Sequence, residues 1–503
     1  MVKSVSHFFY LRNSLIELFH KNTHKMRRSI LALVILAAAL AGCKTKNPVL
    51  TVEGGQIQGV ETTIKGVFVY KGVPFAAPPV GDLRWKEPQP VIPWQGVKIA
   101  DTFSAGAVQS PHDSSNPWTS EFYMTDPEFS EDCLYLNVWT PAPGQTDKKL
   151  PVAMWIHGGG YTGGWSWEPE FDGKVWAQKG VVLVTINYRL GIFGFLTHPL
   201  LAAESPHGVS GNYGILDQIA ALKWIANNIE QFGGDPDNIT ILGQSAGAGS
   251  VKTLCSSPLT GNLIKKAIIQ SGGGVTEPRP ATGGQMPQGF NMPAAPTVEE
   301  IFEWAGYDTL EKMRAASTED IFTLATRYSQ ATGRRGNLNT RPNIDGYVSN
   351  ESFDAAAFDG TIKDIPYMIG YTRDDMGNGS PQGAIDLFCS LRNKAGKPVY
   401  AYQFARPLPD DAAGSHDMKG AFHSSELWFM FKSLDHSDRP FTQADWDLAE
   451  RIITHWTNFA KTGDPGNGWK AFTQDAPDYM VFKVNADETK DASAMGQPVA
   501  RGN

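Results

Sequence analysis

Short apolar runs of strand length recur along the chain from about residue 150 onwards. Each run is continuous rather than alternating, which is typical of a strand with both faces covered. Stretches with helical periodicity lie between the runs. This alternation predicts an α/β fold with a central, mostly parallel twisted sheet and helices on both faces. The runs are Pro151–Ile156, Val181–Ile186, Ile239–Leu242, Ala267–Ile269, Pro366–Ile369 and Val399–Phe404.

Two long amphipathic helices stand out from this pattern. Between Asn212 and Phe232 apolar residues recur every three or four positions, and the pattern stops at Gly233-Gly234, where a helix commonly ends. A second pattern runs from about Ala444 to Lys461 and stops before Gly463-Asp464-Pro465. We expect one helix in each segment.

Glycine and proline mark the segments that we expect outside the central sheet. Val49–Tyr70 alternates β-branched and polar residues between glycines, as a meander of short strands does. Gly72–Pro79 contains so much glycine and proline that we expect neither a helix nor a central strand there. Gly273–Pro296 is predicted to be a loop over the functional face.

The amino-terminal region has the features of an export signal. Arg27-Arg28 precede an apolar run, Ile30–Ala41, that is shorter than the roughly 20 residues needed to span a bilayer. We therefore expect a signal peptide over residues 1–42, with Met26 as a candidate true start. Its end resembles a bacterial lipobox, which implies a lipidated Cys43.

The predicted signal peptide and lipobox determine the domain organisation and the cellular location that we expect for the protein. A tether over residues 43–48 would lead into one folded domain over 49–485, and a polar tail would occupy 486–503. The lipid on Cys43 would be the protein's contact with a bacterial membrane. Because Lys44 follows the cysteine, we expect an exported protein at the outer membrane, facing the periplasm or the cell surface.

Composition excludes several classes of function. The 503 residues are 41% hydrophobic and 19% charged, which suits a globular domain, and the formal net charge of −8 argues against nucleic-acid binding. Cys133, Cys255 and Cys389 remain after Cys43, so at least one of them is free. No cysteine has a partner at metal-ligand spacing, and we expect no metal and no cofactor.

A candidate nucleophile lies in the motif G-x-S-x-G. Gly243-Gln244-Ser245-Ala246-Gly247 follows the apolar run that ends at Leu242 and precedes small residues that can open a helix. This context predicts a sharp strand-to-helix turn that exposes the hydroxyl of Ser245, rather than a glycine-rich surface turn. The glycines on either side remove Cβ atoms that would collide there.

A serine nucleophile also needs amide donors for the oxyanion and a base. His157-Gly158-Gly159-Gly160 follows a predicted strand and suits an oxyanion loop, to which Ala246 would add a further N–H. The order Ser, acid, His along the chain restricts the base to the later histidines. We favour His423, on a predicted loop, over His455 in the last helix; the other histidines in this part of the chain are His416 and His436.

The chain resembles the type-B carboxylesterase family, which includes the cholinesterases and bacterial para-nitrobenzyl esterases, over about residues 49–485. The resemblance implies an α/β-hydrolase fold, Ser245 as nucleophile, His423 as base and oxyanion donors at Gly159, Gly160 and Ala246. It also implies a structural ion pair between Arg84 and Glu131. The matching segments are Gly72–Pro90, Glu131–Val138, Gly158–Gly160, Asn187–Gly191 and Phe232–Gly247.

The acid of the triad is where the chain departs from the family. The family's Asp-Glu-Gly acid motif aligns with Asp374-Asp375-Met376. The resemblance therefore implies Asp375 as the acid, one methylene shorter than the usual glutamate, with Asp374 as the alternative. Only 48 positions separate Asp375 from His423, which implies a shortened lid and a more open cleft.

Two further departures concern the site and a disulfide. Gln244 stands where the family usually has a glutamate, so cationic substrates lose one attraction. Ala107 replaces the expected cysteine partner of Cys133, and we expect that disulfide to be absent. Trp165 and Trp167 follow the glycine loop and either line the cleft, together with Gln244, or pack beneath the loop.

These observations predict a serine carboxylesterase that forms an acyl-enzyme. Its substrate would be a small-molecule or glycan-linked ester. A lipase, or a feruloyl or acetyl esterase acting on plant polysaccharide, would share every catalytic residue. A non-catalytic binding or adhesion module of the same fold is the alternative from another class, and it would typically have lost the triad that this chain retains.

Overall fold

The computed structural model describes residues 47–111, 117–122, 125–277, 295–375, 380–410, 414, 416–485 and 488–491. The predicted signal peptide, Cys43 and Met26 lie outside these residues. Among the described residues no helix has both the length and the apolar character that crossing a membrane requires.

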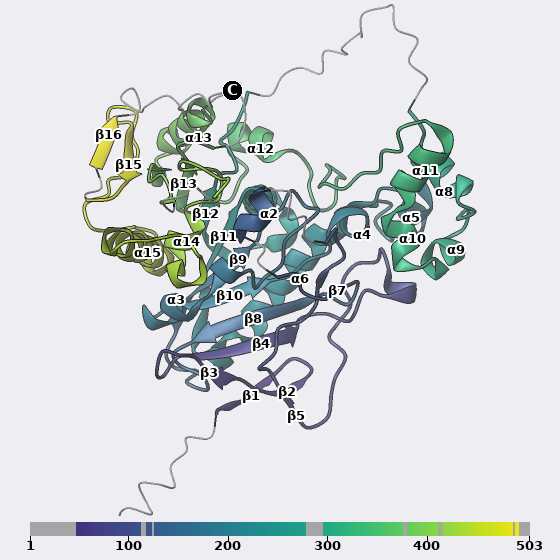
Figure 1. Ribbon diagram of the computed structural model, residues 1–503, viewed down its shortest axis with the longest axis horizontal. Helices are drawn as coiled ribbons and strands as arrows, with labels where there is room; N and C mark the ends of the chain where they lie inside the picture. Colours follow the sequence, from purple (N-terminus) through teal and green to yellow (C-terminus); the bar gives the residue numbers. More distant parts are fainter. Residues whose placement is uncertain are drawn as a thin grey trace, which may run out of the picture. The chain divides into compact units, whose positions relative to one another are not determined.

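The central element of the fold is a large mixed sheet, in the order β16-β15-β14-β13-β12-β11-β9-β10-β8-β4-β3 (Figure 1). Neighbouring strands from β10 through β9 and on to β15 run parallel, whereas the pairs at both ends are antiparallel. The mostly parallel sheet is therefore confirmed. Its strands are β3 (Val60–Glu61), β4 (Phe68–Pro74), β8 (Tyr135–Thr140), β9 (Leu150–Ile156), β10 (Val182–Ile186), β11 (Gly234–Gln244), β12 (Ile264–Gln270), β13 (Tyr367–Thr372), β14 (Val399–Phe404), β15 (Asp478–Phe482) and β16 (Glu488–Asp491).

Both faces of this sheet are buried under helices. Along β9, Met154 and Ile156 belong to one hydrophobic cluster and Trp155 to the other, as alternating side chains must. The first cluster includes side chains of α6 and α7, and the second includes side chains of α14 and α15. The helices are α2 (Pro117–Phe122), α3 (Lys174–Gln178), α4 (Gly191–Phe195), α5 (Pro199–Glu204), α6 (Tyr213–Asn228), α7 (Ala246–Ser256), α8 (Val298–Trp304), α9 (Leu310–Ala315), α10 (Thr318–Phe322), α11 (Leu324–Thr332), α12 (Phe353–Asp359), α13 (Gln382–Lys394), α14 (Leu427–Met430) and α15 (Gln443–Thr462).

The two predicted helices are present close to their expected bounds. α6 is followed by a 3₁₀ turn over Ile229–Phe232, and Gly233 then ends the segment with a φ of 76°. α15 begins and ends within one residue of the prediction and is closed by Gly463 at a φ of 81°. In both cases glycine supplies the left-handed conformation that commonly terminates a helix.

Two expectations about the sheet were wrong. Gly72–Pro74 belongs to β4, although we expected no central strand in Gly72–Pro79. The short β3 pairs with β4 only at Phe68 and Val69 and does not reach Pro74. At Pro74 the paired neighbour of β4 is β8, so the missing N–H of the proline breaks no hydrogen bond to β3. The expected tail from residue 486 also contributes β16, which pairs with β15 and extends the sheet.

A small separate sheet carries exposed apolar side chains. It consists of β1 (Val49–Val52), β2 (Gly55–Gln58) and β5 (Val97–Ile99), in that order. Val49 and Ile99 both pair with Gln58, so their side chains share one face. Both side chains are exposed.

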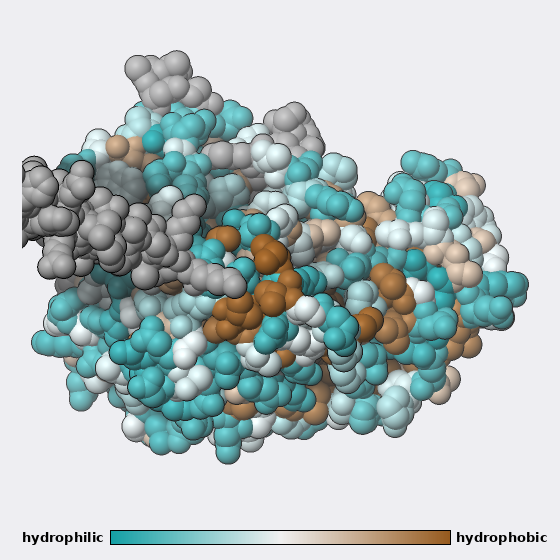
Figure 2. Space-filling view, turned by 90° about the horizontal axis from the view of Figure 1, so that it is seen from below, coloured by the Kyte–Doolittle hydropathy of each residue, from teal (hydrophilic) through white to brown (hydrophobic). Residues whose placement is uncertain are grey.

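The view of the molecule from below shows hydrophobic patches between larger hydrophilic areas of the surface (Figure 2).

The ion pair that the resemblance implied is present and buried. Arg84 Nη2 lies 2.6 Å from Glu131 Oε1, and Arg84 Nε donates to Oε2 at 2.8 Å. Arg84 follows a 3₁₀ turn over Gly81–Leu83 and also donates to the carbonyl of Ala316 at 2.7 Å, so the pair links this turn to the end of α9. Cys133, Cys255 and Cys389 are all free and buried, and the absence of a disulfide at Cys133 is confirmed.

Candidate active site

Ser245 lies at the turn between β11 and α7 with a strained backbone, at φ 57° and ψ −120°. Glycine is required on both sides of it. A Cβ at Gly247 would lie 2.1 Å from the carbonyl oxygen of Ile156, and a Cβ at Gly243 would lie 2.5 Å from the backbone of Gly247. The motif therefore forces the turn that presents the Ser245 side chain beyond the end of β11.

The glycine loop after β9 lies beside this turn. Gly159 has a φ of 92°, and a Cβ there would lie 2.1 Å from the carbonyl oxygen of Gly163. Gly160 has a φ of 64°. Among the described residues, the backbone N–H groups of Gly159 and Gly160 donate no hydrogen bond, which leaves them available to a ligand. Ala246 is the first residue of α7, where backbone N–H groups have no partner within the helix.

The side chains of His423 and Asp375 contact each other. Asp375 follows β13, and the N–H of Thr372 donates to its Oδ2 at 3.3 Å. His423 follows Phe422, which forms an isolated parallel bridge with Asp374. The Nδ1 of His423 hydrogen-bonds to Oδ1 of Asp375, and both side chains are largely buried. The loop position predicted for His423 agrees with the turn that the structure has there.

Asp374 has different partners, which distinguishes the two acid candidates. The guanidinium of Arg373 donates to both of its oxygens, at 2.7 and 3.1 Å, and the N–H of Ala421 donates to Oδ2 at 2.8 Å. Asp374 therefore anchors the segment before His423, whereas Asp375 contacts the imidazole.

The other histidines near the end of the chain do not approach this centre. His455 is buried in α15, where its Nδ1 lies 3.0 Å from the carbonyl oxygen of Pro465. His416 lies between two aspartates, and His436 Nδ1 lies 2.6 Å from the carbonyl oxygen of Pro169.

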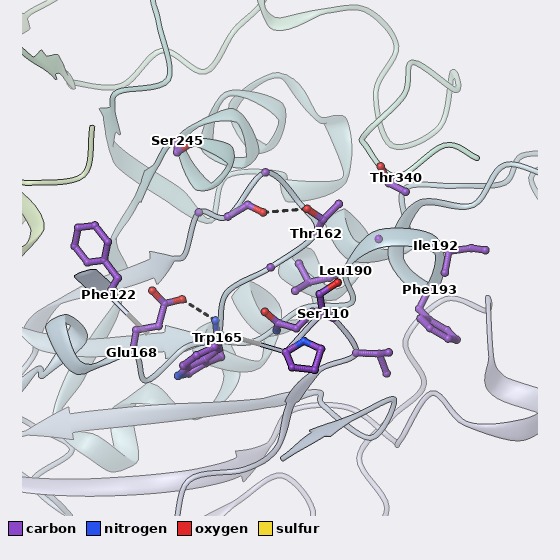
Figure 3. A pocket seen from close by; sticks show the side chains of 18 of the residues that line it. Ser110, Phe122, Thr162, Trp165, Glu168, Leu190, Ile192, Phe193, Ser245 and Thr340 are labelled. Carbon is purple, nitrogen blue, oxygen red and sulfur yellow. Dashed lines mark hydrogen bonds between the residues drawn. The ribbon is translucent and has the colours of Figure 1, made fainter. Parts of the chain in front are cut away.

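A cavity of about 840 Å³ brings these groups together (Figure 3). Ser245, His423 and Gln244 line it, as do all three glycines from Gly158 to Gly160. This volume is typical of a site for a small organic molecule. In Figure 3 the labelled Phe122, Trp165 and Glu168 lie together on one side of the cavity, and Ile192 and Phe193 lie on another.

The two tryptophans differ in their placement. Trp165 lines the cavity, although it is almost fully buried. Trp167 stacks on Phe103 at a centroid distance of 5.0 Å and donates from Nε1 to the carbonyl of Ser104, and it does not line the cavity. Of the pair, only Trp165 is therefore placed to contact a ligand.

Sequence reasoning missed the groups that support the glycine loop. His157 is buried and stacks on Tyr188, and burial lowers its pKa to about 4, so it is neutral at neutral pH. Glu168 accepts a hydrogen bond from the N–H of Trp165 at 2.8 Å. Burial raises the pKa of Glu168 and of the adjacent Glu170. The Glu-Pro-Glu sequence gave no signal of this burial, because glutamates are usually exposed.

Comparison with known proteins identifies the family. The model of the carboxylesterase family matches residues 46–385 and 381–497. The chain belongs to the carboxylesterase family. The esterase is 33% identical to para-nitrobenzyl esterase of Bacillus subtilis over 486 residues, which covers 86% of this chain and 94% of that protein. It is 38% identical to fumonisin B1 esterase of Sphingopyxis macrogoltabida over 330 residues, 64% of this chain and 55% of that protein.

Solved structures agree on the fold. A para-nitrobenzyl esterase structure superposes with a TM-score of 0.71 at 29% identity, covering 89% of this chain and 98% of that one. A carboxylesterase of Geobacillus stearothermophilus gives a TM-score of 0.68 at 28% identity, covering 88% and 97%. The esterase has the α/β-hydrolase fold and is a carboxylic ester hydrolase.

Proposed function

We propose that the esterase cleaves its substrates through an acyl-enzyme on Ser245. His423 removes the proton of the hydroxyl as the oxygen attacks the ester carbonyl, and Asp375 orients the imidazole. The N–H groups of Gly159, Gly160 and Ala246 stabilise the oxyanion. The alcohol then leaves with the proton from His423, and water attacks the acyl-enzyme in the same way to release the acid and regenerate Ser245.

One observation carries this proposal: His423 lines the same cavity as Ser245 and hydrogen-bonds to Asp375. A carboxylate only accepts hydrogen bonds, so Nδ1 of the neutral imidazole carries the proton and Nε2 presents its lone pair. That lone pair is what a general base needs. The unbonded N–H groups of the glycine loop provide the second requirement, a set of donors fixed in place before the charge develops.

A fluorophosphonate probe tests the nucleophile directly. We expect one adduct per protein, located on Ser245 by peptide mass spectrometry, and we expect Ser245→Ala to lower kcat by about 10⁶. The variant should keep the wild-type melting temperature, because only one oxygen atom is removed. An unlabelled but folded protein would indicate a binding module with the same fold.

A panel of nitrophenyl, feruloyl and acetylated-sugar esters would show which alcohol and acyl groups the esterase accepts. The cavity combines apolar walls at Phe122 and Trp165 with the carboxyls of Glu168 and Glu170. We propose a small-molecule or glycan-linked ester as the natural substrate. A preference for long-chain glycerides over every member of this panel would favour a lipase instead.

We also propose that the esterase is exported and anchored by a lipid on Cys43, on the strength of the signal-like run and lipobox in the sequence. Labelling of bacterial cells with a clickable fatty acid should mark the wild-type protein and not Cys43→Ala. The wild-type protein should fractionate with the outer membrane, and the variant should be released as a soluble protein.

A further inference from the structure

Gln244, the residue before the nucleophile, contacts the proposed base directly. It is the last residue of β11, is only 3% exposed, and lines the cavity next to Ser245. Its side-chain nitrogen lies 3.1 Å from Nε2 of His423. This is the ring nitrogen that must take the proton of Ser245, whereas Asp375 binds the other one.

The direction of this hydrogen bond follows from the tautomer. Because Nδ1 donates to the carboxylate of Asp375, Nε2 of the neutral ring has no hydrogen and can only accept. The amide nitrogen of Gln244 must therefore donate to it. A protonated ring would carry a hydrogen on Nε2 as well, and two donors would then face each other at this contact unless the amide turned over.

We propose that Gln244 is a positioning residue that holds the imidazole of His423 through Nε2 in the resting enzyme and stabilises its unprotonated form. The enzyme then keeps an active base at a lower pH than it would without this donor. The amide gives up this contact when Nε2 takes the proton of Ser245. This inference rests on the proposed role of His423. It assigns to Gln244 a function in setting the pH range of hydrolysis, in addition to its place in the wall of the cavity.

The other ionisable groups around the ring act in the opposite direction or are already neutralised. An ionised Asp375 favours the imidazolium, and so would an ionised Glu426, which is buried three residues after His423. Burial raises the pKa of Glu426 to about 7. The remaining charges near the ring are compensated. Arg373 pairs with Asp374, and Arg439, whose guanidinium lies over the ring of Phe422, pairs with Glu121. Glu168 and Glu170 also line the cavity, and burial raises the pKa of both.

Two substitutions at Gln244 separate charge from hydrogen bonding. Gln244→Glu replaces the donor with an anion that favours the imidazolium, and Gln244→Met keeps the length but removes the donor. We expect the acid-side midpoint of kcat/KM against pH to rise by about one pH unit or more in Gln244→Glu, and by about half a unit in Gln244→Met. An uncharged nitrophenyl ester is the substrate, so that the new charge does not act on the substrate itself.

Gln89→Glu is the matched control, because it adds the same charge at an exposed position, and its midpoint should equal that of the wild type. Gln244→Asn has a shorter side chain that cannot reach Nε2, and it should behave like Gln244→Met. It takes the place of Gln244→Glu or Gln244→Met if either of them fails to fold. Folding is judged from the melting temperature and from stoichiometric fluorophosphonate labelling. Unchanged midpoints in the folded Gln244 variants would overturn the proposal. If the folded wild-type protein is not labelled at Ser245, the proposed function is overturned, and this inference with it.

Discussion

The two sides of the active site are held in place by different means. The elbow at Ser245 and the loop at Gly159 are fixed by backbone contacts so close that only glycine fits, with Cβ positions 2.1 Å from carbonyl oxygens at Gly247 and Gly159. The acid–base side depends on side-chain hydrogen bonds between short turns, from Asp375 to His423 and from Arg373 to Asp374. The first arrangement tolerates almost no change in sequence, whereas the second depends on a side-chain contact that a carboxylate as short as that of Asp375 can make.

Replacing the two neighbouring aspartates is the strongest test of this contrast. Asp375→Asn can no longer hold the imidazole as a charged acceptor, and it should lower kcat by about 10⁴, as loss of the triad acid does in serine hydrolases. Asp374→Asn is the matched control. It weakens the pairing with Arg373 but leaves the contact between Asp375 and His423, and we expect less than a tenfold loss. A larger loss in Asp374→Asn than in Asp375→Asn would reverse the assignment of the acid.

This contrast also explains how much the sequence could reveal. Steric requirements on a backbone leave glycines at fixed spacing, so the elbow at Ser245 and the loop at Gly159 were predictable from the residues themselves. The carboxylate that contacts His423 was not, because Asp374 and Asp375 are chemically identical. The turn decides that Asp374 meets Arg373 and the N–H of Ala421, whereas Asp375 meets the imidazole. The place of Pro74 in β4 was missed for a similar reason, since it depends on how far β3 extends.

The glycine loop should respond to a single added methyl group. Gly159→Ala places a Cβ against the carbonyl oxygen of Gly163 and must displace the N–H groups of the proposed oxyanion hole. We therefore expect kcat to fall by about 10²–10³, the usual cost of an oxyanion donor. Gly180→Ala is the matched control, because Gly180 also has a positive φ, of 79°, but open space around its Cα. It should cost about 1 kcal/mol of stability and leave kcat unchanged. Equal losses of activity in the two variants would mean that the close backbone contact at Gly159 is not needed for catalysis.

The support beneath the loop gives the smallest expected effect, and it appears in stability rather than in the rate. His157 is buried and neutral, with its pKa lowered to about 4, whereas an unfolded chain binds a proton to histidine near about 6.5. Between these values the unfolded state holds more protons, so the free energy of unfolding should fall as the pH drops from about 6.5 to 4, by up to about 3 kcal/mol in total. His157→Gln cannot protonate, and denaturant titrations should show a shallower decline for it than for the wild type. An identical pH dependence in the two proteins would mean that the loop is held by Tyr188 and Glu168 without any contribution from the neutral state of His157.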